Sequence, residues 1–247
     1  FLSTLEKSVQ EGKVKIETVN NAVRKILNAK YDLGLFHDPY RYCDSNRAKT
    51  DIFTPEHKAI ARKIATESFV LLKNENQLLP LQKKGTIAVI GPLADAKENM
   101  AGTWSVATKQ ENSIALLKGL QNAGQNKFKV LYAKGANLTE DEKLEELGTM
   151  FGKSLNRDQR SKEALIAEAV KVANQSDVII AALGESAELS GESSSRTDLK
   201  IPEIQQELLD ALLQTGKPVV LVLFNGRPLV LNNEKEKVPA ILNVWFG

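Results

Sequence analysis

Three glutamates, Glu185, Glu188 and Glu192, lie close together in one serine-rich segment that ends at Arg196. The segment follows a short apolar run at 177–182, which is typical of a buried strand. A loop at the carboxyl end of such a strand is where open α/β sheets bind their ligands. Carboxylates in such a loop can perform acid/base chemistry on sugars, because they can donate and accept protons beside a glycosidic bond. The residue types therefore suggest proton transfer, but they leave open which glutamate acts and with which partner.

Each candidate also has a purely structural interpretation. Carboxylates usually lie on the solvated surface, so residue type alone singles out none of the three glutamates. Trp104 stands among small residues on an expected loop, where its ring can either join the core or stack on a sugar. Arg227 belongs to the Asn-Gly-Arg-Pro turn at 225–228, and we expect it to pin a neighbouring loop carboxylate rather than to contact substrate.

The elements that must position these residues are six short apolar runs, several of them separated by helical patterns. The runs are nearly continuous in Val, Ile, Leu and Ala, as expected for strands buried on both faces of a mostly parallel sheet. The fold class is therefore α/β, a three-layer sandwich, although the strand order cannot be deduced from the pattern. The runs lie at 69–72, 86–90, 128–132, 177–183, 219–224 and 240–246, and helical patterns near 113–122, 162–173 and 202–213.

Three distinctive loops follow predicted strands, at 91–95, at 183–196 and at 225–228. Because the carboxyl ends of parallel strands meet at one edge of a sheet, we expect these loops to share that edge. The polar and charged segment at 138–160 is expected to be an exposed insertion.

The first quarter of the chain has a different texture. An amphipathic helix is predicted over 14–33, with Gly34 as its C-terminal cap, and the following residues lack periodicity. Thr54 and Pro55 then have the types of an N-cap and a first helical residue, and they open a helix that runs to about Ser68. We therefore expect residual helices of a preceding domain at 1–36, a linker at 37–53, and an α/β domain at 54–247 that is truncated at its C-terminus.

Composition excludes several classes of protein. The 247 residues are 42% hydrophobic with a net charge of +2, which gives no electrostatic reason to expect nucleic acid or an anionic membrane as a partner. One cysteine, Cys43, and two histidines, His37 and His57, are too few for a typical metal centre, so we expect neither a metal nor a cofactor. The segment at 148–154 is one residue short of a phosphate-binding P-loop, and no dinucleotide fingerprint follows a predicted strand.

Several segments, in order along nearly the whole chain, resemble those of glycoside hydrolase family 3. The segment at 190–196 resembles the Ser-Gly-Glu-Gly-x-Asp-Arg pattern of that family, with Ser193 and Ser195 in place of the commoner glycine and aspartate. Within the family the resemblance is greatest to bacterial periplasmic β-glucosidases. The other matching segments are 24–36, which resembles the end of the family's barrel domain, and 67–74, 78–81, 91–95, 104–105 and 225–228, which resemble its second domain.

The resemblance implies a retaining mechanism with two carboxylates. A nucleophilic aspartate lies on the family's barrel domain, and a loop of the second domain supplies the acid/base glutamate, whose position Glu192 matches. Trp104 matches a tryptophan that stacks on the sugar in the aglycone subsite of some members. Glu185, Glu188, Arg196 and Arg227 are then expected to support the loop.

The implied protein is a periplasmic or secreted hydrolase of terminal β-D-glucosyl residues, acting on β-glucosides or β-linked oligosaccharides in carbohydrate metabolism. Its partner within the enzyme is the barrel domain that carries the nucleophile. This chain alone carries one of the two carboxylates, so we expect it to be inactive by itself. The alternatives are a non-catalytic domain that binds carbohydrate or acts as a scaffold and, with less support, a nucleotide-binding module.

Overall fold

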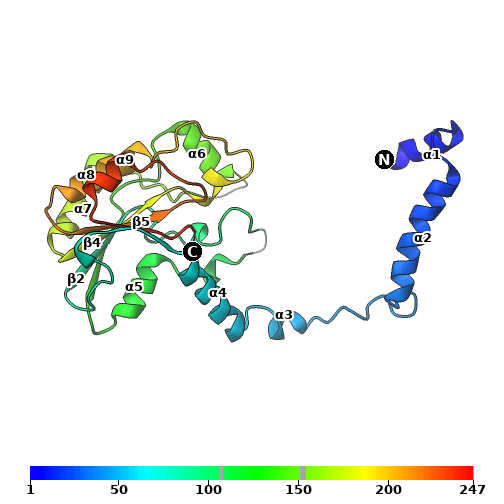
Figure 1. The fold of residues 1–247 in the computed structure, drawn as a ribbon, viewed down its shortest axis with the longest axis horizontal. Helices are drawn as coiled ribbons and strands as arrows, with labels where there is room; N and C mark the ends of the chain where they lie inside the picture. Colours follow the sequence, from blue (N-terminus) through cyan, green and yellow to red (C-terminus); the bar gives the residue numbers. More distant parts are fainter. Residues whose placement is uncertain (106–107, 151–153, 247) are drawn as a thin grey trace. The chain divides into compact units, whose positions relative to one another are not determined.

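The computed structural model describes residues 1–105, 108–150 and 154–246, which form two compact units that divide at Ala61 and Arg62 (Figure 1). The segment at 148–154, which is one residue short of a P-loop, therefore lies partly outside the described residues. The first unit contains α1 (Leu2–Gln10), α2 (Ile16–Asp32) and α3 (Arg47–Thr50). Gly34 follows α2 with a left-handed φ of 71°, as a C-terminal cap requires.

The N-terminal boundaries remain predictions. Helix α3 lies inside the segment predicted to be a linker, and the two units divide within α4 (Pro55–Ser68) rather than before it. The start of α4 itself is confirmed, because the hydroxyl of Thr54 accepts a hydrogen bond from the backbone N–H of His57 at 3.3 Å.

The second unit is built on one six-stranded sheet with the order β1-β6-β5-β4-β2-β3. Only β1 runs antiparallel, and it pairs with β6 at one end of the sheet. The prediction of a mostly parallel sheet is therefore confirmed. The strands are β1 (Val70–Asn74), β2 (Thr86–Ile90), β3 (Lys129–Ala133), β4 (Val178–Gly184), β5 (Val219–Phe224) and β6 (Ala240–Asn243).

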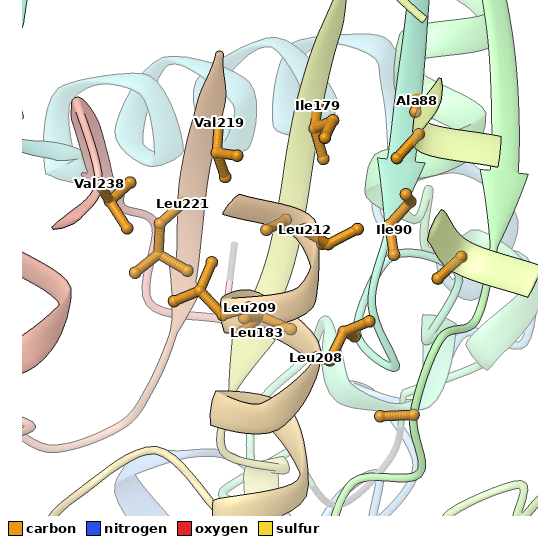
Figure 2. Close-up of a cluster of buried hydrophobic side chains, with 14 of the residues drawn as sticks. Ala88, Ile90, Ile179, Leu183, Leu208, Leu209, Leu212, Val219, Leu221 and Val238 are labelled. Carbon is orange, nitrogen blue, oxygen red and sulfur yellow. The ribbon is translucent and has the colours of Figure 1, made fainter. Parts of the chain in front are cut away.

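Helices cover both faces of this sheet. Side chains alternate along each strand, so that Ile179 and Leu221 face α7 (Lys162–Asn174) and α8 (Glu203–Leu213), while Val220 faces the side covered by α5 (Leu116–Gly124). Figure 2 shows the buried hydrophobic cluster on the α7 and α8 face of the sheet, with leucines of α8 directed at the strands. The remaining helices of this unit are α6 (Glu142–Gly148) and α9 (Asn232–Lys237), and short 3-10 turns are η1 (Glu75–Gln77), η2 (Lys97–Asn99), η3 (Gln110–Asn112) and η5 (Ala187–Ser190).

Two sequence-based expectations about burial were wrong. The apolar run at β1 is not doubly buried, because β1 is the antiparallel edge strand and its Val70, Leu71 and Leu72 are exposed. Conversely, the insertion at 138–160 is not wholly exposed. Leu138 is buried, and Leu155 packs against the cluster on the α5 side of the sheet.

Candidate active site

The five parallel strands place their following loops at one edge of the sheet, as expected. In chain order β3 lies on one side of β2, and β4, β5 and β6 lie on the other, so the chain reverses direction across the sheet between β2 and β4. Such a switch point is the usual ligand site of an open α/β sheet. The loop after β2 packs closely on β4 there, because a Cβ at Gly91 would lie 2.2 Å from the carbonyl oxygen of Ala182.

Glu185 comes directly after β4 and is completely buried, with 0% of its surface exposed. Its Oε1 pairs with the guanidinium of Arg196 and lies 3.5 Å from Nε of Arg227. Burial raises the pKa of this carboxyl, and the two arginines oppose that rise without reversing it. We call Glu185, Arg196 and Arg227 the buried cluster.

Glu188 is buried as well, within η5. Its Oε2 accepts a hydrogen bond from the hydroxyl of Thr103 at 2.8 Å. The same threonine packs on the backbone of Gly191, where a Cβ would lie 2.4 Å from its Oγ1. The loop that carries Trp104 is therefore tied to the loop that carries Glu192.

Glu192 is the exposed member of the three glutamates and lies in a turn. The hydroxyl of Ser194 donates to the carbonyl of Glu188 at 2.6 Å, which closes this turn from within. Ser193 has a φ of +61°, a conformation that favours glycine. The family pattern has glycine at this position, and the left-handed backbone gives the physical reason for it.

Trp104 is 72% exposed, so the interpretation of this residue as part of the core was wrong. Its neighbour Thr103 is anchored by the hydrogen bond to Glu188, and Gly102 before it has a left-handed φ of 72°. An exposed indole on an anchored loop can present its face to a sugar ring.

Arg227 does more than pair with a carboxylate. Its guanidinium Nη2 donates to the carbonyl of Leu189 and, at 2.7 Å, to the carbonyl of Ser194. These two carbonyls flank Glu192 in the sequence. The contacts of Arg227 thus include the main chain of the loop that carries Glu192, and its supporting role stays a prediction.

Two supporting residues escaped sequence reasoning. Gln205 of α8 is completely buried, and its amide bonds to both the N–H and the carbonyl of Gly184 at the end of β4. The signal was a polar residue within the apolar face of α8. The ring of Phe246 packs against Gly226 and Gly102, so it bridges the loop after β5 and the Trp104 loop. Nothing in the local sequence marks that contact.

A cavity of about 1050 Å³ opens on the α6 side of Arg196, and Glu192 is not among its lining residues. Charged residues of both signs line it, including Asp141, Lys200 and Glu203, and its described lining holds no aromatic ring to stack on a sugar. Glu192 and Trp104 instead project from the surface. Among the described residues, no group of His, Cys, Asp and Glu could hold a metal ion, and no helix is long and apolar enough to cross a membrane.

The chain is similar to known glycosidases over nearly its whole length. The chain is 46% identical over 242 residues to a periplasmic beta-glucosidase of Salmonella typhimurium, covering 97% of this chain and 32% of that protein. It is 33% identical over 249 residues to a beta-xylosidase of Formosa agariphila, covering 98% of this chain and 31% of the relative. The chain thus spans about a third of the length of the curated relatives it matches.

The fold is shared with a solved beta-glucosidase from Listeria innocua, seen in complex with isofagomine. That structure matches with a TM-score of 0.81 and 34% identity, over 98% of this chain and 30% of that one. A D270A mutant of the same enzyme, in complex with laminaribiose, matches with a TM-score of 0.80. The model of the glycosyl hydrolase family 3 C-terminal domain matches residues 69–247. This chain therefore belongs to glycoside hydrolase family 3 and contains its C-terminal α/β domain.

Proposed function

We propose that this chain supplies the acid/base glutamate, Glu192, to a retaining β-glucosidase that acts on terminal β-D-glucosyl residues. The observation that carries the proposal is the contrast in exposure among the three glutamates of the loop. Glu185 and Glu188 are buried and engaged by protein groups, so neither can reach a substrate oxygen. Glu192 alone projects from the ligand edge of the sheet.

The proposed mechanism is a double displacement. The carboxyl of Glu192 donates a proton to the departing oxygen while a nucleophilic aspartate, on a barrel domain outside this sequence, bonds to the anomeric carbon. The resulting Glu192 carboxylate then removes a proton from the water that releases the sugar. Retention requires the two carboxyl groups about 5–5.5 Å apart, so the two domains must meet at the Glu192 turn.

The similarity to a periplasmic beta-glucosidase supports β-glucosides as substrates and the periplasm as the compartment. The laminaribiose complex of the Listeria innocua enzyme supports β-linked oligosaccharides as a further substrate class. Trp104 is proposed to stack on the aglycone, since it is the exposed aromatic on the loop anchored beside Glu192.

The test is Glu192→Ala in the full-length enzyme that carries this domain. Loss of the acid should lower kcat/KM about 10²–10⁴-fold for glycosides with poor leaving groups and much less for activated aryl glycosides. Azide should partly restore turnover of activated substrates, because a small anion can replace the missing base. Glu236→Ala on α9, four residues before β6 and so at the opposite edge of the sheet, is the matched control and should be silent.

A uniform loss across leaving groups would assign the acid/base role to another residue. Unchanged chemistry in Glu192→Gln, with only weaker substrate binding, would instead support a scaffolding or carbohydrate-binding domain. The isolated chain should not hydrolyse p-nitrophenyl β-glucoside, because it holds one of the two carboxylates. Turnover by the isolated chain that is abolished by Glu192→Gln would contradict the two-domain site.

A second test addresses Trp104. Trp104→Ala should raise KM for aryl glucosides several-fold and leave the melting temperature nearly unchanged, since the indole is exposed. Trp104→Phe should retain most of the stacking. An unchanged KM in Trp104→Ala would remove this residue from the subsite.

A further inference from the structure

The Glu192 side chain has no support of its own. Within the residues that the structure describes, its carboxylate has neither a hydrogen bond nor an ion pair, and only its carbonyl is contacted, by the Ser194 hydroxyl at 3.3 Å. A general acid must nevertheless be held to within a fraction of an ångström of the oxygen it protonates. The position of the Glu192 carboxyl therefore depends on the backbone of its turn.

One side chain from a different loop holds that backbone at two points. Arg227, on the loop after β5, donates through one nitrogen to the carbonyls of Leu189 and Ser194. These residues lie three before and two after Glu192, so the guanidinium closes the turn from outside while the Ser194 hydroxyl closes it from inside. Both ends of the segment carrying Glu192 are thus hydrogen-bonded to the loop after β5.

The guanidinium in turn lies beside a buried carboxylate, with Nε of Arg227 3.5 Å from Oε1 of Glu185. Glu185 is completely buried, its backbone N–H bonds to the carbonyl of Phe224 at 2.9 Å, and its side chain faces Arg227 and Arg196 together. Arg196 lies four residues after Glu192, and only 5% of its side chain is exposed. The buried cluster therefore joins the end of β4, the loop after β5 and the chain beyond Glu192.

We propose that Arg227, oriented by Glu185, is a positioning residue for the acid/base step. It holds the backbone of the Glu192 turn so that the Glu192 carboxyl lies where it can transfer a proton to the substrate. This inference rests on the function proposed for Glu192. Loosening the turn should displace the carboxyl without removing it. A displacement of about 1 Å can lower a rate about 100-fold, and the loss should fall on the steps that need the proton.

The experiment is Arg227→Lys in the full-length enzyme, compared with Glu192→Ala and with the control Arg160→Lys. Lysine keeps a positive charge, but its single ammonium cannot both face Glu185, as Nε of Arg227 does, and donate to the two carbonyls, as Nη2 does. We expect kcat to fall by up to about 100-fold for poor leaving groups and by less for activated ones, with KM little changed. Azide should not restore activity, because the Glu192 carboxylate remains and repels the anion. Arg160 lies in a separate ion-pair group on the surface, and its variant should be silent.

A purely structural role predicts something different. It would reduce the fraction of active enzyme equally for every substrate, so a uniform loss in Arg227→Lys would overturn the inference and leave the function of Glu192 intact. If Glu192→Ala itself showed no dependence on the leaving group, both the inference about Arg227 and the proposed function of Glu192 would be overturned. Should Arg227→Lys fail to fold, Ser194→Ala removes only the inner hydrogen bond of the turn. It should show the same leaving-group dependence to a smaller degree, and a uniform loss there would also overturn the inference.

Discussion

Two groups of arginines and carboxylates in this domain use the same chemistry in opposite surroundings. In the buried cluster, Glu185 is fully buried and the Arg196 side chain is 5% exposed. In the second group, which we call the surface cluster, Arg160 bonds to Asp158 at 2.7 Å and to Glu168 at 2.8 Å, but its side chain is 49% exposed. The Arg196–Glu185 pair is as close as the surface pairs, so the ion-pair distance alone does not distinguish the two groups.

The difference lies in solvent and in what each cluster connects. The surface cluster joins residues within one stretch of eleven, from Asp158 to Glu168, and water and salt screen it. The buried cluster joins three segments up to 42 residues apart in the chain, from Glu185 to Arg227, around a carboxylate that is fully buried. Only the buried cluster can transmit a position from the sheet to the Glu192 turn.

The two environments also move carboxyl pKa values in opposite directions. Burial raises the pKa of Glu185 despite its arginines. Hydrogen bonds from the side chain and backbone of Arg160 lower the pKa of Asp158. An ion pair therefore produces a net lowering of the carboxyl pKa only where the loss of hydration is small.

The largest test of this contrast is removal of an arginine from each cluster. Arg196→Ala leaves the buried Glu185 carboxylate with only the more distant Arg227, and removing one partner of a buried pair typically lowers the free energy of unfolding by about 3–5 kcal/mol. Urea unfolding of the chain, followed by circular dichroism, measures this difference.

Arg160→Ala is the matched control. Its partners are exposed and can be solvated, so the urea midpoint should not move measurably. Equal midpoints for the two variants would show that the buried cluster contributes no more to the free energy of unfolding than a surface ion pair does.

Sequence alone predicted the elements well and the interior of the site poorly. The runs of Val, Ile and Leu placed all six strands to within a few residues, except that β6 ends at Asn243 rather than at 246. Hydrophobic periodicity is a local signal, which is why it could be read. The family pattern directed attention to Glu192, whose assignment remains a proposal.

The rest depends on contacts between distant segments. Nothing near Glu185 indicates that it is buried, because its partners Arg196 and Arg227 follow 11 and 42 residues later. The burial of Leu138 and the exposure of β1 likewise follow from position in the sheet rather than from residue type. Patterns of type and spacing do not contain that information.

A smaller change in the free energy of unfolding is expected from substituting the residues with left-handed backbone near each cluster. Ser193, in the Glu192 turn, and Asn156, beside the surface cluster, have φ values of +61° and +49°. Ser193→Gly should relieve this strain and stabilise the chain by about 0.5–1 kcal/mol, since a left-handed L-residue costs about 1–2 kcal/mol and glycine loses part of that gain in chain entropy. The urea midpoint should therefore rise.

Asn156→Gly should not stabilise. Asparagine tolerates the left-handed conformation, and its side-chain amide donates to Glu98 at 2.7 Å, a hydrogen bond that glycine cannot make. A gain in Asn156→Gly, or a loss in Ser193→Gly, would contradict the assignment of strain to the Glu192 turn.

The smallest and sharpest test is the pH dependence of stability. The folded pKa of Glu185 is raised, so the folded state binds more protons than the unfolded state above the ordinary carboxyl pKa of about 4.3. The stability that Glu185 contributes is full below that value and is lost as pH rises through the folded pKa. Asp158 has a lowered pKa, so its contribution to stability is present above about pH 3.9 and is lost as pH falls.

Wild type should therefore lose stability relative to Glu185→Gln as pH rises from 4 toward neutral. It should gain stability relative to Asp158→Asn as pH rises from 2 to 5. Thermal melting across this range measures both differences. Slopes of the same sign would mean that the arginines, rather than burial, set the charge state of Glu185, and the buried cluster would then be an ordinary ion pair removed from solvent.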